Sequence, residues 1–553
     1  MKLLCIFFLS SFPVYATTQF DYAFPFTKLL EHDAKTGLLT PNGQKNYQQL
    51  EKSLQTGKQQ DFNTIERTKG TQRLFANPQA AFAHTYPKLD PESIKVLPPP
   101  ALSSAQAAAD LIELYVMAFC RDVCFAQYGT GKNTDSDGKG GSLTKTACKL
   151  LTGLGSAYPG NKKGDTVDVT FLFRGTSPGD LIGPCISQFL LQPYFPLFPS
   201  APTEVGAEHL SKDILMRKRH VPILKQREFG VSWDDFIALQ NGKIPKQLRS
   251  SDYDAHAMRN PMTGRDFAAF VYTDVSYDPY YYAINVLACN GFPYSKAFPY
   301  QKGIMKNEAA GPTMGLADVY SLIASVCTQA YKICWYYKWR VYRCLRPEAM
   351  AGLVHYSYSN TRNPFNLHES LFDKELLDLV LQHNQKQAQK NVDPVQLLSW
   401  SQASTYLLAQ IYPEGSPIHP SYPAAHATIA GACITIIKAF FDDTVRIASY
   451  MPILIVDPAH PDRLKKYYSS AMHIMTVGSE LDKLASNIAM GRSWAGLHFR
   501  SDNEAGLQLG EQIAIRYLQE HARMYHEECF AGFELTKRDG KRIRITASEV
   551  ISL

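Results

Sequence analysis

The stretch EGSPIHPSYPAAHATIAGAC, from Glu414 to Cys433, decides how the fold of this chain is interpreted. Its proline-rich lead-in ends at Pro423, which suits the first turn of a helix. The free amides of Ala424, Ala425 and His426 would then point outward, and a helix N-terminus of this kind attracts an anion. Small residues follow and predict that a second helix comes close, namely Ala427, Ala430, Gly431 and Ala432.

A second stretch, KWRVYRCLRPEA, contains two cations that look buried. Lys338 and Arg346 are eight residues apart, which on one continuous helix places them about 80° apart. Long side chains can converge over that arc, although two cations that reach solvent are an equally ordinary explanation. The helical pattern begins at Thr313, and we expect Pro347 to end it.

A third stretch, AMGRSWAGLHFRSDNEAG, places Arg492 and His498 on either side of a glycine-containing turn. Asp502 lies four residues after His498, so a helix would bring the carboxylate next to the ring. The carboxylate would hold one ring nitrogen and leave the other to ligate a metal or to act chemically. A surface ion pair is the alternative for this spacing taken alone.

Together the three stretches predict a pocket for a tetrahedral oxyanion. Three cations would offset the charge of the oxyanion, one histidine would bond its central atom, and the other would move protons. Phosphate and vanadate both fit this description.

These stretches resemble the vanadium-dependent haloperoxidases, and specifically the algal-type bromoperoxidases. The spacing of eight between Lys338 and Arg346 and the Gly-Arg pair before the last histidine are similar to that branch. ELYVMAFCRDVCF and LFRGTSPGDLIGPCISQFLL also look like this family, and the resemblance covers nearly all of residues 40 to 520. It implies an all-α fold with two four-helix bundles in one large helical unit and minor β-hairpins.

By position, the resemblance assigns roles in binding vanadate. His498 would be the axial metal ligand, and Asp502 would orient it. Lys338, Arg346 and Arg492 would bind the equatorial oxygens.

The resemblance also implies roles in the chemistry with hydrogen peroxide. His426 would be the acid–base group, Lys338 would polarise the bound peroxide, and His419 matches a second histidine of the cleft. Halide, which the resemblance to bromoperoxidases implies is bromide, would be oxidised to hypohalous acid, which halogenates small organic acceptors. Tyr337 lines the halide side of the pocket or is simply a core aromatic residue.

One departure concerns the start of the helix. The family reads Ser-Gly-His where this chain has Ala424, Ala425 and His426. The missing hydroxyl removes one donor to the oxyanion, and Ala425 puts a methyl group where glycine allows close approach. We expect weaker vanadate binding, by roughly 10- to 150-fold, because one bond to a charged group is lost.

The chain divides in sequence into five expected parts. Residues 1–16 form a signal peptide with cleavage near Ala16, so we expect an exported protein. Residues 17–103 are an extension of mixed structure, 104–312 and 313–526 are two helical halves, and the vanadate site lies in the second. Residues 527–553 form a β-hairpin tail around Asp539 and Gly540. Long helical patterns are expected at 105–119, 370–388, 396–411, 424–441, 463–490 and 498–523.

Composition favours a globular protein, with 45% hydrophobic and 20% charged residues in 553. No later apolar run is long enough to span a membrane. The net charge of +6 is mild, and no zinc-finger or RNA-binding motif accompanies the basic runs, so nucleic acid is not an expected partner. Ten of the 11 cysteines lie beyond residue 16 and permit disulfides of unknown connectivity.

Structural calcium is a further possibility. Asp135 and Asp137 lie in a glycine-rich loop, but the twelve-residue calcium-binding pattern is absent and a surface loop is the better interpretation. We expect a homo-oligomer by resemblance to the algal relatives.

Two alternative functions remain open from the sequence. The related acid phosphatases use the same constellation to bind phosphate, with the histidine matching His498 as nucleophile. A non-catalytic oxyanion-binding protein is the second alternative, and the Ala424-Ala425 pair is its only support.

Overall fold

The computed structural model describes residues 25–85, 87–192, 227–245, 259–272, 275–301, 310–390, 404–527 and 529–553. The predicted signal peptide lies outside these residues.

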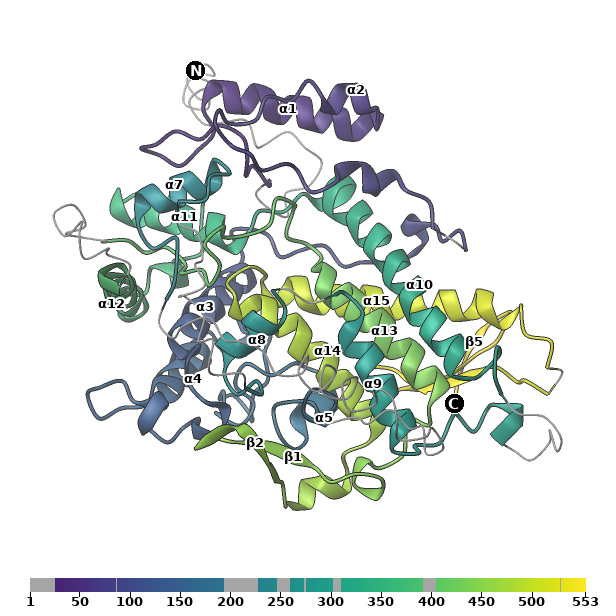
Figure 1. Ribbon diagram of the computed structural model, residues 1–553. Helices are drawn as coiled ribbons and strands as arrows, with labels where there is room; N and C mark the ends of the chain where they lie inside the picture. The colour runs from purple at the N-terminus through teal and green to yellow at the C-terminus, as the bar shows by residue number, and fades with distance from the viewer. Residues whose placement is uncertain are drawn as a thin grey trace, which may run out of the picture.

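The described chain is mainly helical with two small antiparallel sheets, which confirms the all-α prediction (Figure 1). Its α-helices are α1 (Pro41–Thr56), α2 (Gln59–Phe62), α3 (Ala105–Cys120), α4 (Leu143–Gly153), α5 (Gln188–Leu191), α7 (Trp233–Gln240), α8 (Gly264–Phe270), α9 (Asp278–Cys289), α10 (Leu316–Trp335), α11 (Pro347–Ser359), α12 (Lys374–Lys390), α13 (Ala425–Phe440), α14 (Val477–Trp494) and α15 (Arg500–Ala522). The strands are β1 (Leu454–Asp457), β2 (His460–Lys466), β3 (Phe533–Thr536), β4 (Arg542–Ile545) and β5 (Val550–Ser552).

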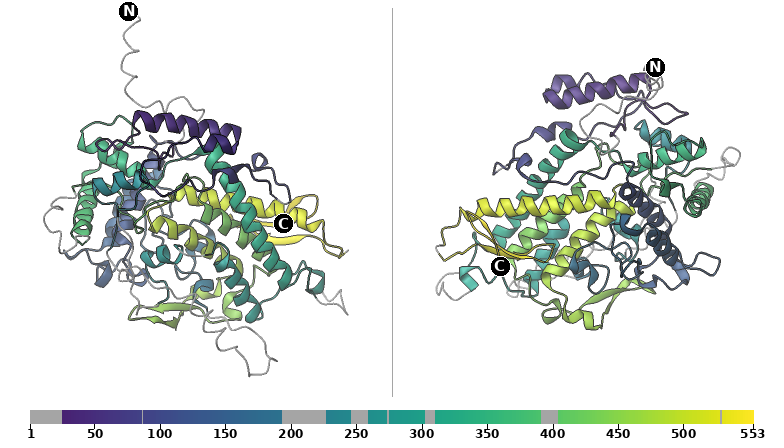
Figure 2. Two further views of the ribbon diagram at one scale, coloured as in Figure 1. Left: turned by 45° about the horizontal axis from the view of Figure 1, so that its top comes forward. Right: turned by 180° about the vertical axis from the view of Figure 1, so that it is seen from behind.

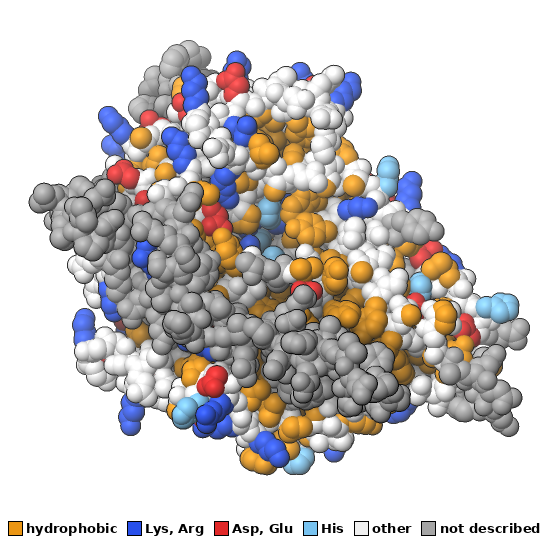
Figure 3. Space-filling view, in the orientation of Figure 1, with side chains coloured by type: hydrophobic (Ala, Val, Ile, Leu, Met, Phe, Trp, Pro, Cys, Tyr) orange, Lys and Arg blue, Asp and Glu red, His pale blue; other side chains and the backbone are white. Residues whose placement is uncertain are grey.

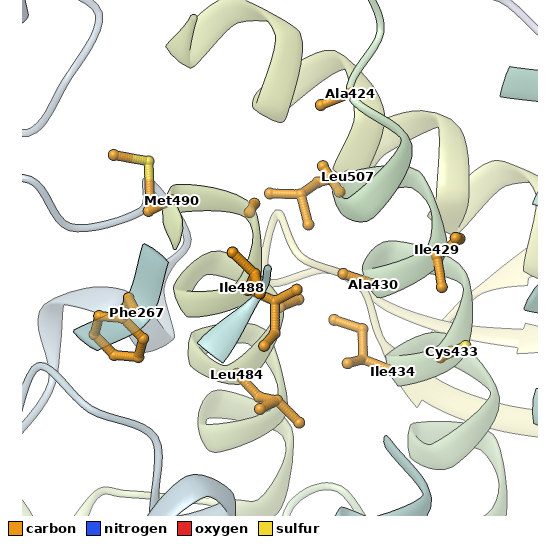
Figure 4. Packing of buried hydrophobic residues seen from close by; sticks show 14 of the residues in the cluster. Phe267, Ala424, Ile429, Ala430, Cys433, Ile434, Leu484, Ile488, Met490 and Leu507 are labelled. Carbon is orange, nitrogen blue, oxygen red and sulfur yellow. The ribbon is translucent and has the colours of Figure 1, made fainter. Parts of the chain in front are cut away.

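Helix α13 is the centre of a four-helix bundle with α10, α14 and α15. Every residue of α13 except His426 is buried, because its small and apolar side chains give it no polar face to turn to water. Figure 4 shows Ile434 of α13, Ile488 of α14 and Leu507 of α15 within the shared core.

The small residues of α13 allow the backbone of α15 to approach closely, as the sequence predicted. A Cβ atom on Gly431 would lie 2.2 Å from the carbonyl oxygen of Leu507, and one on Gly510 would lie 2.0 Å from that of Thr428. Neither position can hold a larger residue without moving a helix. This contact fixes α15 beside the start of α13.

A second group of helices forms around α3, which packs against α4, α11 and α14. Helix α3 lies where the sequence predicted a helix over 105–119, and its N-cap is Ser104, whose hydroxyl accepts a hydrogen bond from the amide of Ala107 at 3.1 Å.

The predicted continuous helix from 313 to 345 is wrong. Helix α10 ends at Trp335 and continues as a π-helix over Tyr336–Tyr342, and the chain then turns at Arg343, which is left-handed with φ 48°. Pro347 does not end a helix but occupies the first turn of α11. Lys338 and Arg346 therefore belong to different elements.

Two other helix predictions also fail. In the region 396–411 the described residues 404–411 are not helical, and Gln410 instead pairs with Phe229 through two backbone hydrogen bonds of 2.8 and 2.9 Å. In the region 463–490 the chain first completes β2 in a hairpin with β1, and α14 begins only at Val477.

The C-terminal hairpin is confirmed in place but differs in form. Residues 537–541 connect β3 to β4, and Gly540 takes the left-handed conformation with φ 86°. The loop is thus longer than the predicted two residues, and β5 adds a third strand.

The N-terminal segment crosses one end of the molecule, opposite the β1–β2 hairpin (Figure 2). Phe26 and Phe75 pack edge-on against Trp339 of the π-helix, with ring centroids 5.9 and 6.1 Å apart. The amide of Ala76 donates to the carbonyl oxygen of Ile418 at 2.8 Å. This segment therefore supports the loop that leads into α13.

No disulfide links the ten cysteines within the described residues to one another. Within the same residues no helix is long and apolar enough to cross a membrane.

The loop proposed as a possible calcium site is held by its own hydrogen bonds. Asp135 accepts from Gly131, Ser142 and Thr144, and Asp137 accepts from the amides of Lys139 and Gly141. Both carboxylates serve the turn, and calcium is not shown.

Candidate functional site

The predicted site residues meet at one place, where the start of α13, the π-helix and the turn between α14 and α15 come together. Most of these side chains are buried. Figure 3 shows a hollow in this face of the molecule, in which histidine and cationic side chains are visible between hydrophobic ones.

His498 and Asp502 are in contact, as predicted. Nδ1 of His498 lies 2.8 Å from Oδ2 of Asp502, which also accepts from the amide of Phe499 at 3.0 Å and from the hydroxyl of Ser421. His498 precedes α15 rather than lying on it, so Asp502 reaches it from the first helical turn. Because the carboxylate accepts, Nδ1 carries the proton and Nε2 presents its lone pair.

Arg346 faces that lone pair. Its Nη1 lies 3.0 Å from Nε2 of His498 and donates to the carbonyl oxygen of Leu497 at 2.9 Å. Its Nε donates to the carbonyl oxygen of His419 at 3.0 Å. Burial lowers the pKa of Arg346 to about 9.

The π-helix aims Lys338 into the same space. The amide of Arg343 donates to the carbonyl oxygen of Lys338 at 2.9 Å, five residues back, and the widened turn carries the side chain inward. Nζ donates to the carbonyl oxygens of Pro420 and Ser421 at 2.7 and 2.6 Å. Burial, together with nearby Arg346, lowers the pKa of Lys338.

Arg492 lies at the end of α14. Its guanidinium lies over the ring of Tyr412, 5.6 Å from the centroid, and Nη1 donates to the carbonyl oxygen of Val271 at 2.9 Å. Its Nε is buried and has no hydrogen-bond partner among the described residues.

The electrostatics of these residues fit an oxyanion such as vanadate. Lys338, Arg346 and Arg492 are three buried cations, and Asp502 is the one carboxylate hydrogen-bonded to the ring of His498. Burial without enough opposite charge is what lowers the pKa of the two cations described above. Burial also lowers the pKa of His498 well below its ordinary value, with the three cations adding to the effect. A bound anion would relieve this excess of positive charge.

The start of α13 differs from the prediction in one respect. The amide of Ala424 does not point outward but donates to the carbonyl oxygen of Asp502 at 2.9 Å. Ala424 is the N-cap residue, so the amides at the open end of the helix are those of Ala425, His426 and Ala427. Ala425 is 4% exposed and packs in a cluster with Trp335, whereas His426 is partly exposed.

His419 lies next to the cations, with Nδ1 3.0 Å from Nη2 of Arg346. Its ring is 4.7 Å from that of Trp335, and burial followed by the charge of Arg346 lowers its pKa well below its ordinary value.

Tyr337 turns away from this space. Its hydroxyl donates to the carbonyl oxygens of Pro91 and Ile94, and its ring stacks on Tyr342 at 6.0 Å. The core-aromatic interpretation is therefore the better one.

Two residues of the site were missed by the sequence reasoning. Ser421 supplies both a hydroxyl to Asp502 and a carbonyl oxygen to Lys338. Glu348 accepts from Nζ of Lys28 at 2.5 Å and from the amide of Ser416 at 2.8 Å, which fixes the loop ahead of His419. Ser421 lay within the quoted proline-rich stretch, but a carbonyl contact leaves no side-chain pattern to find.

Comparisons with known proteins agree with this geometry. A family model described as the VCPO second helical-bundle domain matches residues 319–527. The vanadium-dependent bromoperoxidase of Corallina pilulifera is 33% identical over 487 residues, which cover 82% of this chain and 77% of that protein. The enzyme of the same name from Ascophyllum nodosum is 32% identical over 472 residues, covering 83% and 75%.

A solved structure is also similar. It is the homohexameric structure of the second vanadate-dependent bromoperoxidase from Ascophyllum nodosum, with a TM-score of 0.79 and 26% identity. The match covers 97% of this chain and 86% of that one.

Proposed function

Because this chain belongs to the vanadium-dependent haloperoxidases, enzymes that oxidise halide with hydrogen peroxide, we propose that its halide is bromide and its product hypobromous acid. The hypobromous acid would then halogenate small organic acceptors. The bromoperoxidase names of its relatives support the choice of halide.

One observation carries the proposed site: Arg346 contacts Nε2 of His498, whose other ring nitrogen is bonded to Asp502, and the buried cations Lys338 and Arg492 are close enough for their charges to act on the same ring. In the proposal, vanadate binds to Nε2 of His498, and Lys338, Arg346 and Arg492 neutralise its oxygens. Vanadate supplies a Lewis acid that activates peroxide without changing oxidation state.

The protein's own groups supply orientation and protons. Asp502 keeps His498 in the tautomer whose Nε2 can bind the metal. His426, partly exposed in the first turn of α13, is the proposed acid–base group that exchanges a proton with incoming peroxide. His419, held beside Arg346, completes the wall of the site.

We also propose that the protein is exported and forms a homo-oligomer. The apolar run at residues 3–12 supports export. The homohexameric relative supports oligomerisation.

The test is bromination of a diketone by the purified protein with hydrogen peroxide, with and without added vanadate and with and without bromide. The proposal predicts turnover only when both are present, and inhibition by phosphate. His426→Ala should lose bromination while it keeps most of the bound vanadium, with exposed His460→Ala as the matched control.

Other outcomes would favour the alternatives. Hydrolysis of a phosphate ester that vanadate inhibits, without bromination, would indicate a phosphatase. Bound vanadate without any turnover would indicate a site that keeps the anion and has lost its chemistry. Full bromination by His426→Ala would contradict the acid–base role.

A further inference from the structure

A buried carboxylic acid lies behind the proposed oxyanion site and has no role in the chemistry described above. Asp110 of α3 is 2% exposed. Its Oδ1 accepts a long hydrogen bond from the amide of Ser501, at 3.4 Å. Ser501 is the residue before Asp502, so α3 and the first turn of α15 meet here.

Asp110 and Asp502 line the same small cavity. Its volume is about 40 Å³, and it is also lined by Cys344 and Phe499 and, toward the surface, by Pro100 and Leu102. By the same measure, one water molecule needs only about 10–15 Å³, provided that polar groups are present to bond it. Two carboxyl groups and a backbone amide provide those partners.

Arg500, a cation close enough to influence Asp110, is already paired with another carboxylate. Arg500 binds Glu113, one turn further along α3, through two hydrogen bonds of 2.8 and 2.6 Å. Tyr158 donates to the same carboxylate at 2.9 Å. Asp110 thus has two carboxylates near it, those of Asp502 and the paired Glu113. Tyr422 is also close enough that a charge on Asp110 would raise the pKa of its hydroxyl.

These surroundings favour the uncharged form of the acid. Burial raises the pKa of Asp110 to about 8, the hydrogen bond from Ser501 opposes the rise, and the charges of Glu113 and Asp502 add to it. The buried site thus favours the protonated acid, which can donate a hydrogen bond, over the carboxylate.

We propose that Asp110 is a positioning residue for the oxyanion site: as an uncharged acid it holds a water in the cavity shared with Asp502 and keeps negative charge away from the bound oxyanion. The water supports the carboxylate of Asp502, whose Oδ2 is bonded to His498. Ionised Asp110 would place a second negative charge behind Asp502 and weaken the binding of any oxyanion in front of it. This inference rests on the proposed vanadate site.

The experiment measures vanadate affinity by equilibrium dialysis at about pH 7 and about pH 9 for the full-length protein, Asp110→Asn and Asp110→Leu. The ionisation of vanadate itself is common to all three. Between the two pH values, vanadate affinity should fall in wild type by a factor at least about five times larger than in either uncharged variant. Asp110→Leu should also bind more weakly than Asp110→Asn at neutral pH, because it cannot hold the water.

The outcomes separate the claims. If wild type and both variants lose affinity equally with rising pH, Asp110 has no such role, although the vanadate site stands. If wild type binds no vanadate, the proposed function fails as well. If Asp110→Asn does not fold, the pH dependence of Asp110→Leu decides the charge part of the proposal, since leucine needs no hydrogen-bond partner.

Discussion

The pair Ala424 and Ala425 shows how small side chains at the start of α13 determine which groups can bind vanadate. Both are buried, and the amide of Ala424 donates to the carbonyl oxygen of Asp502, so the amides at the open end of α13 begin one residue later than the sequence suggested. A serine at 424 would restore one hydroxyl, and a glycine at 425 would remove a methyl group from the cluster around Trp335.

We therefore predict that Ala424→Ser with Ala425→Gly tightens vanadate binding by roughly 10-fold or more, because one bond to a charged group is gained. Equilibrium dialysis against vanadate measures it. Ala425→Gly alone is the control, and it should account for only a small part of the gain. Unchanged affinity in the double variant would show that the missing hydroxyl is immaterial.

The side chains of the site were largely predictable, and their contacts were only partly so. His498 and Asp502 meet as their spacing predicted. Lys338 and Arg346 were expected to converge from one helix, but they do so from two elements separated by a left-handed turn at Arg343. Residues that act through carbonyl oxygens carry no spacing pattern, so the contacts of Pro420 and Ser421 with Lys338 could not be predicted.

At the scale of elements, helices with local start signals were predicted well. Helix α3 has its serine cap, and α13 and α15 have long periodic patterns. The strand β2 was mistaken for helix because its identity depends on pairing with β1, for example Leu464 opposite Val456, rather than on its own sequence. Thr476 is the N-cap of α14, and this capping residue could have located the true start of the helix from the sequence.

The contact between α13 and α15 gives a prediction at this scale. Gly510→Ala should destabilise the protein by about 1–3 kcal/mol, because the added methyl group meets the backbone of α13. Gly153→Ala in α4 is the matched control: nothing lies within 4 Å of its Cβ, and alanine favours a helix over glycine by about 1 kcal/mol. Urea denaturation of both variants measures the difference. Equal stability of the two variants would contradict the close approach.

At the scale of the whole molecule, the large core encloses many ionisable groups. The extent of the helical body followed from the family resemblance, which covers nearly all of residues 40 to 520. The ion pair between Lys28 and Glu348, which ties the N-terminal segment to the site, joins residues too far apart in sequence to be predicted.

One partly buried histidine gives a prediction for how stability depends on pH. Burial lowers the pKa of His355 to about 4, and its Nδ1 accepts from the amide of Tyr406 at 3.3 Å. As the pH falls, the unfolded chain binds a proton at His355 before the folded chain does. The contribution of neutral His355 to stability is therefore complete above about pH 6.5 and is lost as the pH falls toward about 4. This group should remove roughly 2 kcal/mol between about pH 7 and pH 5.

The measurement compares urea denaturation at the two pH values for wild type and His355→Phe, which keeps a ring against Trp233. The variant should lose less stability on acidification than wild type, whatever its stability at neutral pH. An identical loss in both proteins would mean that His355 is not held neutral.

The most direct test of the central claim is the vanadium content per chain after reconstitution and dialysis, compared between wild type, His498→Ala and the surface control His460→Ala. If the buried cations and Nε2 of His498 form the cofactor site, wild type and the control retain about one vanadium per chain and His498→Ala retains almost none. Equal vanadium in all three proteins would contradict the assignment of the site.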